Sequence, residues 1–103
     1  MDELIYSKEE ILSVLRDINE FVVSLDQMNK VHHEFGEEAW KNEIIDYFQT
    51  ARVSDRLAQV RSMLSKPFPS EIGPDDMDEL EREMQGVQYW TFKEYLAKKN
   101  GKA

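Results

Sequence analysis

The chain has 103 residues, of which 41% are hydrophobic and 33% charged; it has no cysteine and a formal net charge of −8. This length suits one ordinary domain and is too short for a doubly wound nucleotide-binding fold or a barrel enzyme. The lack of cysteine excludes disulfide scaffolds, thiolate zinc sites and thiol nucleophiles. The acidic balance argues against nucleic acid and anionic membranes as direct partners, since both attract clustered lysine and arginine. The sequence has no apolar signal region and no membrane-spanning run, so we expect a cytoplasmic protein.

Apolar residues recur at helical spacing between glycine and proline positions, and no run alternates with the period of a strand. The sequence therefore predicts an all-α fold, an antiparallel bundle of four to five helices that forms a single domain over residues 1–103.

The first predicted helix covers residues 8 to 35. Ser7 and Glu10 have the spacing of a capping box at its start. Its apolar stripe follows a heptad pattern through four heptads and includes Ile11, Val14, Ile18, Phe21, Leu25, Met28, His32 and Phe35. Leu15, Val22 and Val31 make the stripe wider than a bare heptad seam. Such a helix is long for this chain, so we expect it either to break between Ser24 and Asn29 or to extend into a partner.

The remaining elements follow from the same periodicity. We expect a helix from Glu37 to about Ala51, where the apolar stripe changes phase. The new stripe, which begins at Val53, indicates either a kink or a third helix that ends before Pro67. Phe68 and Ile72 are expected to plug the core, and Pro74 to begin a fourth helix. A last helix is expected to carry Trp90 and to stop at Asn100. Four aromatic side chains on one short helix cannot all face one core, so we expect most of them to pack in the core or cover the end of the bundle and either Tyr89 or Tyr95 to be exposed; the four are Tyr89, Trp90, Phe92 and Tyr95.

Charge is unevenly distributed along the chain. Residues 1–51 carry a net charge of −8, residues 52–70 carry +3, residues 71–83 carry −6, and residues 84–103 carry +3. This pattern either orders basic and acidic helices within the bundle or presents an acidic surface to a basic partner. For the second case, the residues expected to bind a protein partner are Asp17, Glu20, Glu34, Glu37, Glu38, Trp40, Glu43, Asp46 and Tyr47.

Catalytic and metal-binding patterns are weak. The chain has no glycine-rich phosphate loop and no recognisable nucleophile motif, so we expect no enzyme activity and no cofactor. His32, His33 and Glu37 form the only cluster with metal-ligand character, but position 29 is Asn and position 30 is Lys, where di-iron bundles place glutamate. We therefore predict no metal site, and keep a carboxylate–histidine metalloprotein as a third alternative.

The leading hypothesis is a non-catalytic interaction protein, an acidic inhibitor or adaptor that binds a basic protein surface. The main alternative is a structural subunit or homodimeric module that pairs through the heptad seam of the first helix.

The C-terminal run AKKNGKA, the small size and the acidic charge resemble those of the all-α immunity proteins of nuclease colicins, over roughly the last 12 residues. The paired tyrosines before a proline that mark that family are missing, since the nearest run is Asp46-Tyr47-Phe48. The resemblance implies a category, an immunity-type inhibitor, and no family assignment.

Overall fold

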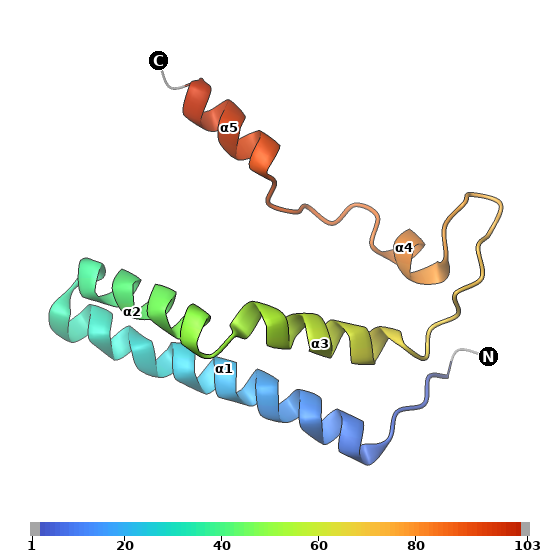
Figure 1. Ribbon diagram of the computed structural model, residues 1–103, viewed down its shortest axis with the longest axis horizontal. Helices are drawn as coiled ribbons and strands as arrows, with labels where there is room; N and C mark the ends of the chain where they lie inside the picture. The colour runs from blue at the N-terminus through green and yellow to red at the C-terminus, as the bar shows by residue number, and fades with distance from the viewer. Residues whose placement is uncertain (1–2, 102–103) are drawn as a thin grey trace. The chain divides into compact units, whose positions relative to one another are not determined.

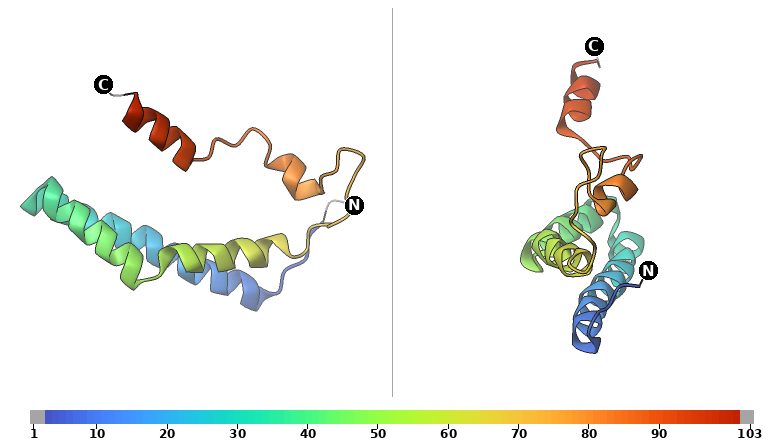
Figure 2. Two further views of the ribbon diagram at one scale, coloured as in Figure 1. Left: turned by 45° about the horizontal axis from the view of Figure 1, so that its top comes forward. Right: turned by 90° about the vertical axis from the view of Figure 1, so that its right-hand side faces the viewer.

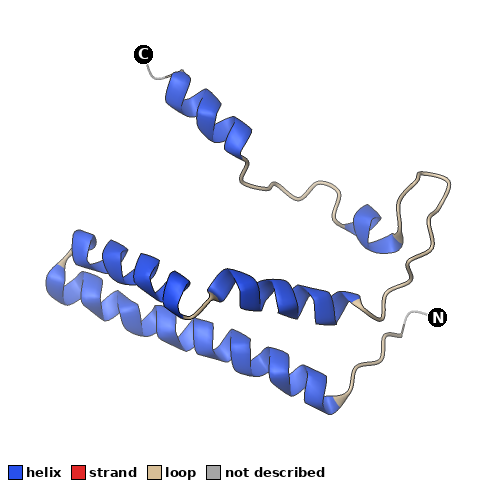
Figure 3. Cartoon of the chain, in the orientation of Figure 1, coloured by secondary structure: helices blue, strands red, loops and turns tan. Residues whose placement is uncertain are grey.

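The computed structural model describes residues 3–101, which contain five α-helices and no strand (Figure 1, Figure 3). The helices are α1 (Lys8–Phe35), α2 (Glu37–Thr50), α3 (Val53–Ser65), α4 (Glu79–Glu83) and α5 (Phe92–Asn100). This architecture confirms the predicted all-α class and the long N-terminal helix. The chain divides into two compact units, one ending at Phe68 and the other beginning at Pro69.

In the first unit, α1 is one unbroken helix of 28 residues that packs against both α2 and α3. Figures 1 and 2 show α2 and α3 following each other along α1 in the opposite direction. At 1.5 Å per residue α1 is about 42 Å long, close to the combined length of its two neighbours. The length of α1 is therefore explained by packing within this unit, and the expected break between Ser24 and Asn29 does not occur.

The ends of α1 are defined by local hydrogen bonds. The Glu10 amide donates to Ser7 Oγ at 3.1 Å and the Ser7 amide donates to Glu10 Oε1 at 3.0 Å, which completes the predicted capping box. Just before it, the Tyr6 hydroxyl donates to the Leu64 carbonyl at 2.6 Å and ties the start of α1 to the end of α3. At the other end Gly36, at a φ of 95°, reverses the chain in a conformation that favours glycine.

A second special conformation separates α2 from α3. Arg52 has φ 53° and ψ 48°, in the left-handed region, and ends the helical path of α2. The change of phase predicted at Ala51 is thus a true break, and α3 begins at Val53.

The core of the first unit is a thin layer between α1 and the α2–α3 arm. Only Phe21, Val53 and Val60 are buried among the described hydrophobic residues. Val14 and Met28, two further seam residues, are partly buried. The heptad seam of α1 is therefore largely occupied by the chain's own helices, although Ile18 remains 37% exposed and Phe35 78% exposed.

The second unit begins its helices later than predicted. A turn precedes α4, in which the Asp76 amide donates to the Gly73 carbonyl, and Asp78 caps the helix with Glu81. The expectation that Pro74 begins the fourth helix is therefore wrong. Thr91 caps α5 by accepting from the Glu94 amide, so Trp90 lies outside the last helix, also contrary to prediction. That helix ends at Asn100, as expected.

The expected packing of Trp90 and Phe92 in the core is also wrong, whereas the exposure expected for Tyr89 or Tyr95 is observed. Trp90 is 77% exposed, Phe92 64% and Tyr89 63%, while Tyr95 is 42% exposed. These rings contact one another instead. The centroid of the Tyr95 ring lies 6.1 Å from the ring centroid of Trp90 and 6.3 Å from that of Phe92. Ile72, expected to plug the core, is 59% exposed. Too few apolar side chains occur in this short segment to enclose them.

The burial of Phe21 predicts a large and specific effect on stability. Phe21→Ala should lower the free energy of unfolding by about 3 kcal/mol, because it leaves a cavity in the thin core. Phe35→Ala on the same helix removes an equal side chain from an exposed position. This variant should change the free energy of unfolding by less than about 0.5 kcal/mol. Urea unfolding followed by circular dichroism measures both values. Equal losses for the two variants would contradict this assignment of the core.

Candidate protein-interaction surface

One side of the helical hairpin carries an ion cluster centred on Arg56 of α3. Its guanidinium contacts Asp17 Oδ1 at 2.6 Å and Glu20 Oε2 at 2.8 Å, both on α1. The same group lies 4.7 Å from the centroid of the Phe21 ring, within the range of a cation–π contact. The Tyr47 hydroxyl of α2 donates to Glu20 Oε2 at 3.3 Å. The cluster thus joins all three helices.

Two of the carboxylates predicted to bind a partner, Asp17 and Glu20, belong to this cluster and bind Arg56 instead. Hydrogen bonds from Arg56 hold the pKa of Glu20 below its ordinary value, with a smaller contribution from the positive charge itself. The two carboxylates in turn raise the pKa of Arg56 above its ordinary value. Asp17 and Glu20 therefore share the one positive charge of Arg56, and their main observed contact is with α3.

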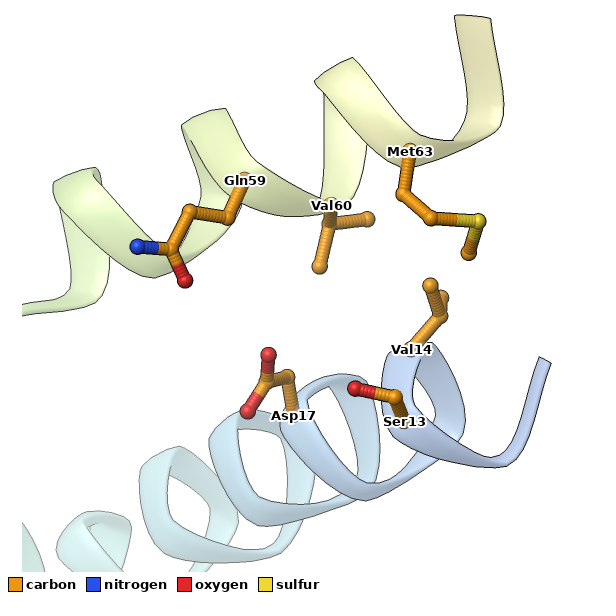
Figure 4. Close-up of a pocket in the computed structure, with 6 residues that line it drawn as sticks. All are labelled: Ser13, Val14, Asp17, Gln59, Val60 and Met63. Atoms are coloured by element: carbon orange, nitrogen blue, oxygen red, sulfur yellow. The ribbon is translucent and has the colours of Figure 1, made fainter. Parts of the chain in front are cut away.

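A shallow depression lies beside this cluster, between α1 and α3 (Figure 4). It has a volume of about 200 Å³ and is lined by Ser13, Val14, Asp17, Gln59, Val60 and Met63. Figure 4 shows Asp17 and Gln59 facing each other across the gap. Small-molecule sites usually enclose about 300–1,000 Å³. This depression is smaller than that range, and its one charged group is already bound to Arg56.

The opposite side of the hairpin carries a group of exposed hydrophobic side chains. Six of them are exposed by 54% for Leu15, 37% for Ile18, 61% for Val22, 57% for Ile45, 40% for Phe48 and 42% for Leu57. We refer to these six residues as the apolar face. Among the described residues 3–101 only three hydrophobic side chains are buried, so these six form a larger group than the core itself.

Helical geometry places the six residues together. Leu15, Ile18 and Val22 form one stripe on α1, turned by about a quarter turn from the buried side of that helix. Ile45, Phe48 and Leu57 are displaced in the same rotational sense from the partly buried side of α2 and the buried side of α3. Because α1 runs antiparallel to those helices (Figure 1), helical periodicity places stripes displaced in the same sense on one side of the hairpin.

The apolar face was only partly visible in the sequence. One sequence feature indicated it: the apolar stripe of α1 is wider than a heptad seam, and Leu15 and Val22 contribute to that width. Ile45 and Leu57 gave no comparable signal, because their exposure depends on where α2 and α3 contact α1.

The turn end of the hairpin brings together several other predicted partner-binding residues. Glu34, Glu38 and Glu43 are exposed, and Glu37 is paired only with Lys41, at 3.7 Å. Between these carboxylates lies Phe35, which is 78% exposed. We refer to these five residues, Glu34, Phe35, Glu37, Glu38 and Glu43, as the acidic end.

The two predicted aromatic anchors lie closer to the interior. Trp40 is partly buried, with its ring 5.3 Å from that of His32 in an edge-on contact. Tyr47 is also partly buried and donates its hydroxyl to Glu20. Asp46, also predicted to bind a partner, is exposed.

The two histidines of the predicted metal-ligand cluster, His32 and His33, are both exposed. Between residues 3 and 101, no three side chains of the metal-ligating kinds come close enough to hold an ion together. In the same range, no helix combines the length and the apolar character needed to cross a bilayer.

Comparison with known proteins gives no match at any level. No family model fits the sequence, and no curated protein or solved structure shows significant similarity to it.

The Arg56 cluster predicts that the carboxyl of Glu20 titrates at a lowered pH as long as Arg56 is present. In the wild-type protein the carboxyl of Glu20 should titrate below the ordinary value of 4.5, and in Arg56→Gln it should titrate closer to that value. A lowered folded-state pKa means that the stabilisation is complete above the unfolded-state pKa and is lost as the pH falls through the folded-state value. Carboxyl carbon shifts in a pH series by NMR measure both midpoints. Glu9, which is exposed and outside the cluster, serves as the reference, and identical Glu20 midpoints in both proteins would contradict the assignment.

Proposed function

We propose that this chain is a non-catalytic protein-interaction module and that the apolar face of its helical hairpin is the binding surface. The observation that carries this proposal is the gathering of six exposed hydrophobic side chains on one side of α1, α2 and α3. By their exposed fractions the six residues present on the order of 500 Å² of apolar surface. An apolar patch of this size is as large as the largest patch on a typical monomeric protein, and such patches are often functional.

A binding role rather than catalysis is supported by how the polar groups are used. The best-organised polar cluster in the first unit is the Arg56 cluster, in which one arginine binds two carboxylates across the helices. That arrangement stabilises the hairpin and leaves its carboxylates hydrogen-bonded, whereas an acid–base residue needs a group held ready for a substrate proton. The partner of the apolar face is a protein surface of matching apolar character, such as the apolar side of another helix pair.

A second candidate function uses the acidic end. Exposed carboxylates around an exposed phenylalanine favour a basic protein surface with room for one apolar side chain, as an acidic inhibitor or immunity-type protein would require. Residues 26–50 carry six carboxylates against two lysines, so the charge here is not balanced by neighbouring helices.

The apolar face predicts position-dependent cross-linking. A benzophenone amino acid at Val22, on the face, should give protein adducts of defined mass in native extracts. The same group at Val23, which is 48% exposed and turned away from α2 and α3, should not. Adding Leu57→Glu, on the same face but on another helix, should suppress the Val22 adducts. Adducts of equal yield from both positions, or adducts unaffected by Leu57→Glu, would refute the proposed surface.

The acidic end predicts salt-sensitive binding. A benzophenone group in place of Phe35 should give adducts whose yield falls several-fold between about 50 and 500 mM salt, because exposed charges are screened over this range. Glu34→Lys with Glu38→Lys should lower the yield at low salt. Glu9→Lys, an equally exposed change near the start of α1, is the matched control. An adduct yield independent of salt would exclude electrostatic recognition at this end.

A further inference from the structure

We propose that the partner of the apolar face is the same face of a second copy of this chain, so that two hairpins form a symmetric four-helix assembly. This inference rests on the proposed function, because it names the partner of the surface described there. Three observations support it: the thinness of the core, the absence of carboxylates from the face, and the area available for burial.

The first unit is only two helices thick. One helix pairs with a broken arm of similar length, and only three hydrophobic side chains between them are buried. Helical domains generally bury each apolar stripe against another element, and a pair of antiparallel helices becomes a complete bundle when a second pair packs on its open side. A second copy supplies such a pair with matching length and matching apolar rows.

The carboxylates nearest the centre of the apolar face are turned away from it, and the charged side chains one helical turn beyond its residues include Asp26, Lys41 and Arg61. Within the stretch of α1 from Leu15 to Val22, the carboxylates are Asp17 and Glu20, and both bind Arg56 on the other side of the hairpin. On the α2–α3 arm, Asp55 is paired with Arg52 at 2.8 Å. Asp46 follows Ile45 by one residue and is therefore turned about 100° away from it.

This distribution matters because self-association must overcome the repulsion of two acidic chains. With a net charge of −8 on each chain, a contact through the acidic end would bring like charges together. A contact through the apolar face brings together aliphatic and aromatic side chains while the carboxylates stay outside. Among the surfaces of the hairpin, the apolar face therefore meets its own copy at the lowest electrostatic cost.

The available area matches what a dimer needs. Stable complexes bury about 800 Å² on each partner, and homodimer contacts are more apolar than the average interface. The six residues of the face present on the order of 500 Å², and the partly buried Ile11 and Leu25 extend the α1 stripe. The apolar side chains thus supply more than half of the area that a stable dimer needs, and the polar side chains at the edges of the face supply the rest in the proposed contact.

The proposed contact differs from the one expected from the heptad pattern. The buried Phe21 and the partly buried Val14 and Met28 lie between α1 and its own neighbours, so they are not free to pair with another copy. Ile18 belongs to both the heptad seam and the apolar face. The dimer contact is thus displaced by about a quarter turn from the seam.

The first test is the mass of the full-length protein by sedimentation velocity over a wide concentration range. We expect a species of twice the 12.2 kDa chain mass that dissociates on dilution. Val22→Glu should raise the dissociation constant by about 100-fold or more, because it buries a carboxylate in an apolar contact. Val23→Glu is the matched control and should leave the dissociation constant unchanged within a few-fold. A wild-type protein that remains monomeric at every concentration overturns the inference.

A second measurement does not depend on any variant folding. Mixing isotope-labelled and unlabelled wild-type chains allows NMR to detect only contacts between different copies. We expect intermolecular contacts at the methyl groups of Ile18, Val22 and Leu57. A dimer whose contacts lie elsewhere, for example at the aromatic rings of α5, would also overturn the inference.

The outcomes separate this inference from the proposed function. A monomeric wild-type protein that still gives Val22-specific adducts with another protein would refute self-pairing and leave the interaction surface in place. A monomer with no such adducts would refute both. Val22-specific adducts of twice the chain mass, together with the intermolecular methyl contacts, would support both.

Discussion

The contact between Arg56 and α1 is the interaction on which the arrangement of the first unit depends. Arg56 lies on the first turn of α3, directly after the break at Arg52 that separates α3 from α2. Its guanidinium bonds to Asp17 and Glu20 and covers the ring of Phe21, so it aligns α3 with α1 at the point where the chain is least regular. Because these are charge-assisted and directional bonds, they define the register of the two arms, which hydrophobic packing alone would specify less sharply.

That register also decides which surfaces remain open. With Arg56 held against one side of α1, the buried residues face inward and the displaced stripes of both arms turn to the other side. The hairpin therefore has one polar side, satisfied internally, and one apolar side, exposed. This division is the physical basis for assigning a binding role to the apolar face and for naming a second copy as its partner.

The turn at Gly36 has a different consequence. The turn brings Glu34, near the end of α1, close to Glu37 and Glu38, at the start of α2. The dipole of α2 favours carboxylates at that position. Part of the negative charge at this end thus has a structural explanation, while the exposure of Phe35 among these carboxylates does not. The acidic end and the apolar face occupy different parts of the hairpin, so a dimer formed through the face would leave the acidic ends available to a basic partner.

The sequence by itself determined the helical class, the capping box at Ser7 and the bounds of α1, because these depend on local periodicity and on hydrogen bonds between near neighbours. It also located the break near Ala51 through a change of phase. It misplaced the start of the fourth helix, because the turn at Gly73 and the cap at Asp78 competed with the preference of Pro74 for a first helical position. Only the tertiary structure decided which side of α1 is buried. A stripe wider than one contact can be covered from either side, and the choice depends on Arg56, whose carboxylate partners lie 36 and 39 residues earlier in the chain.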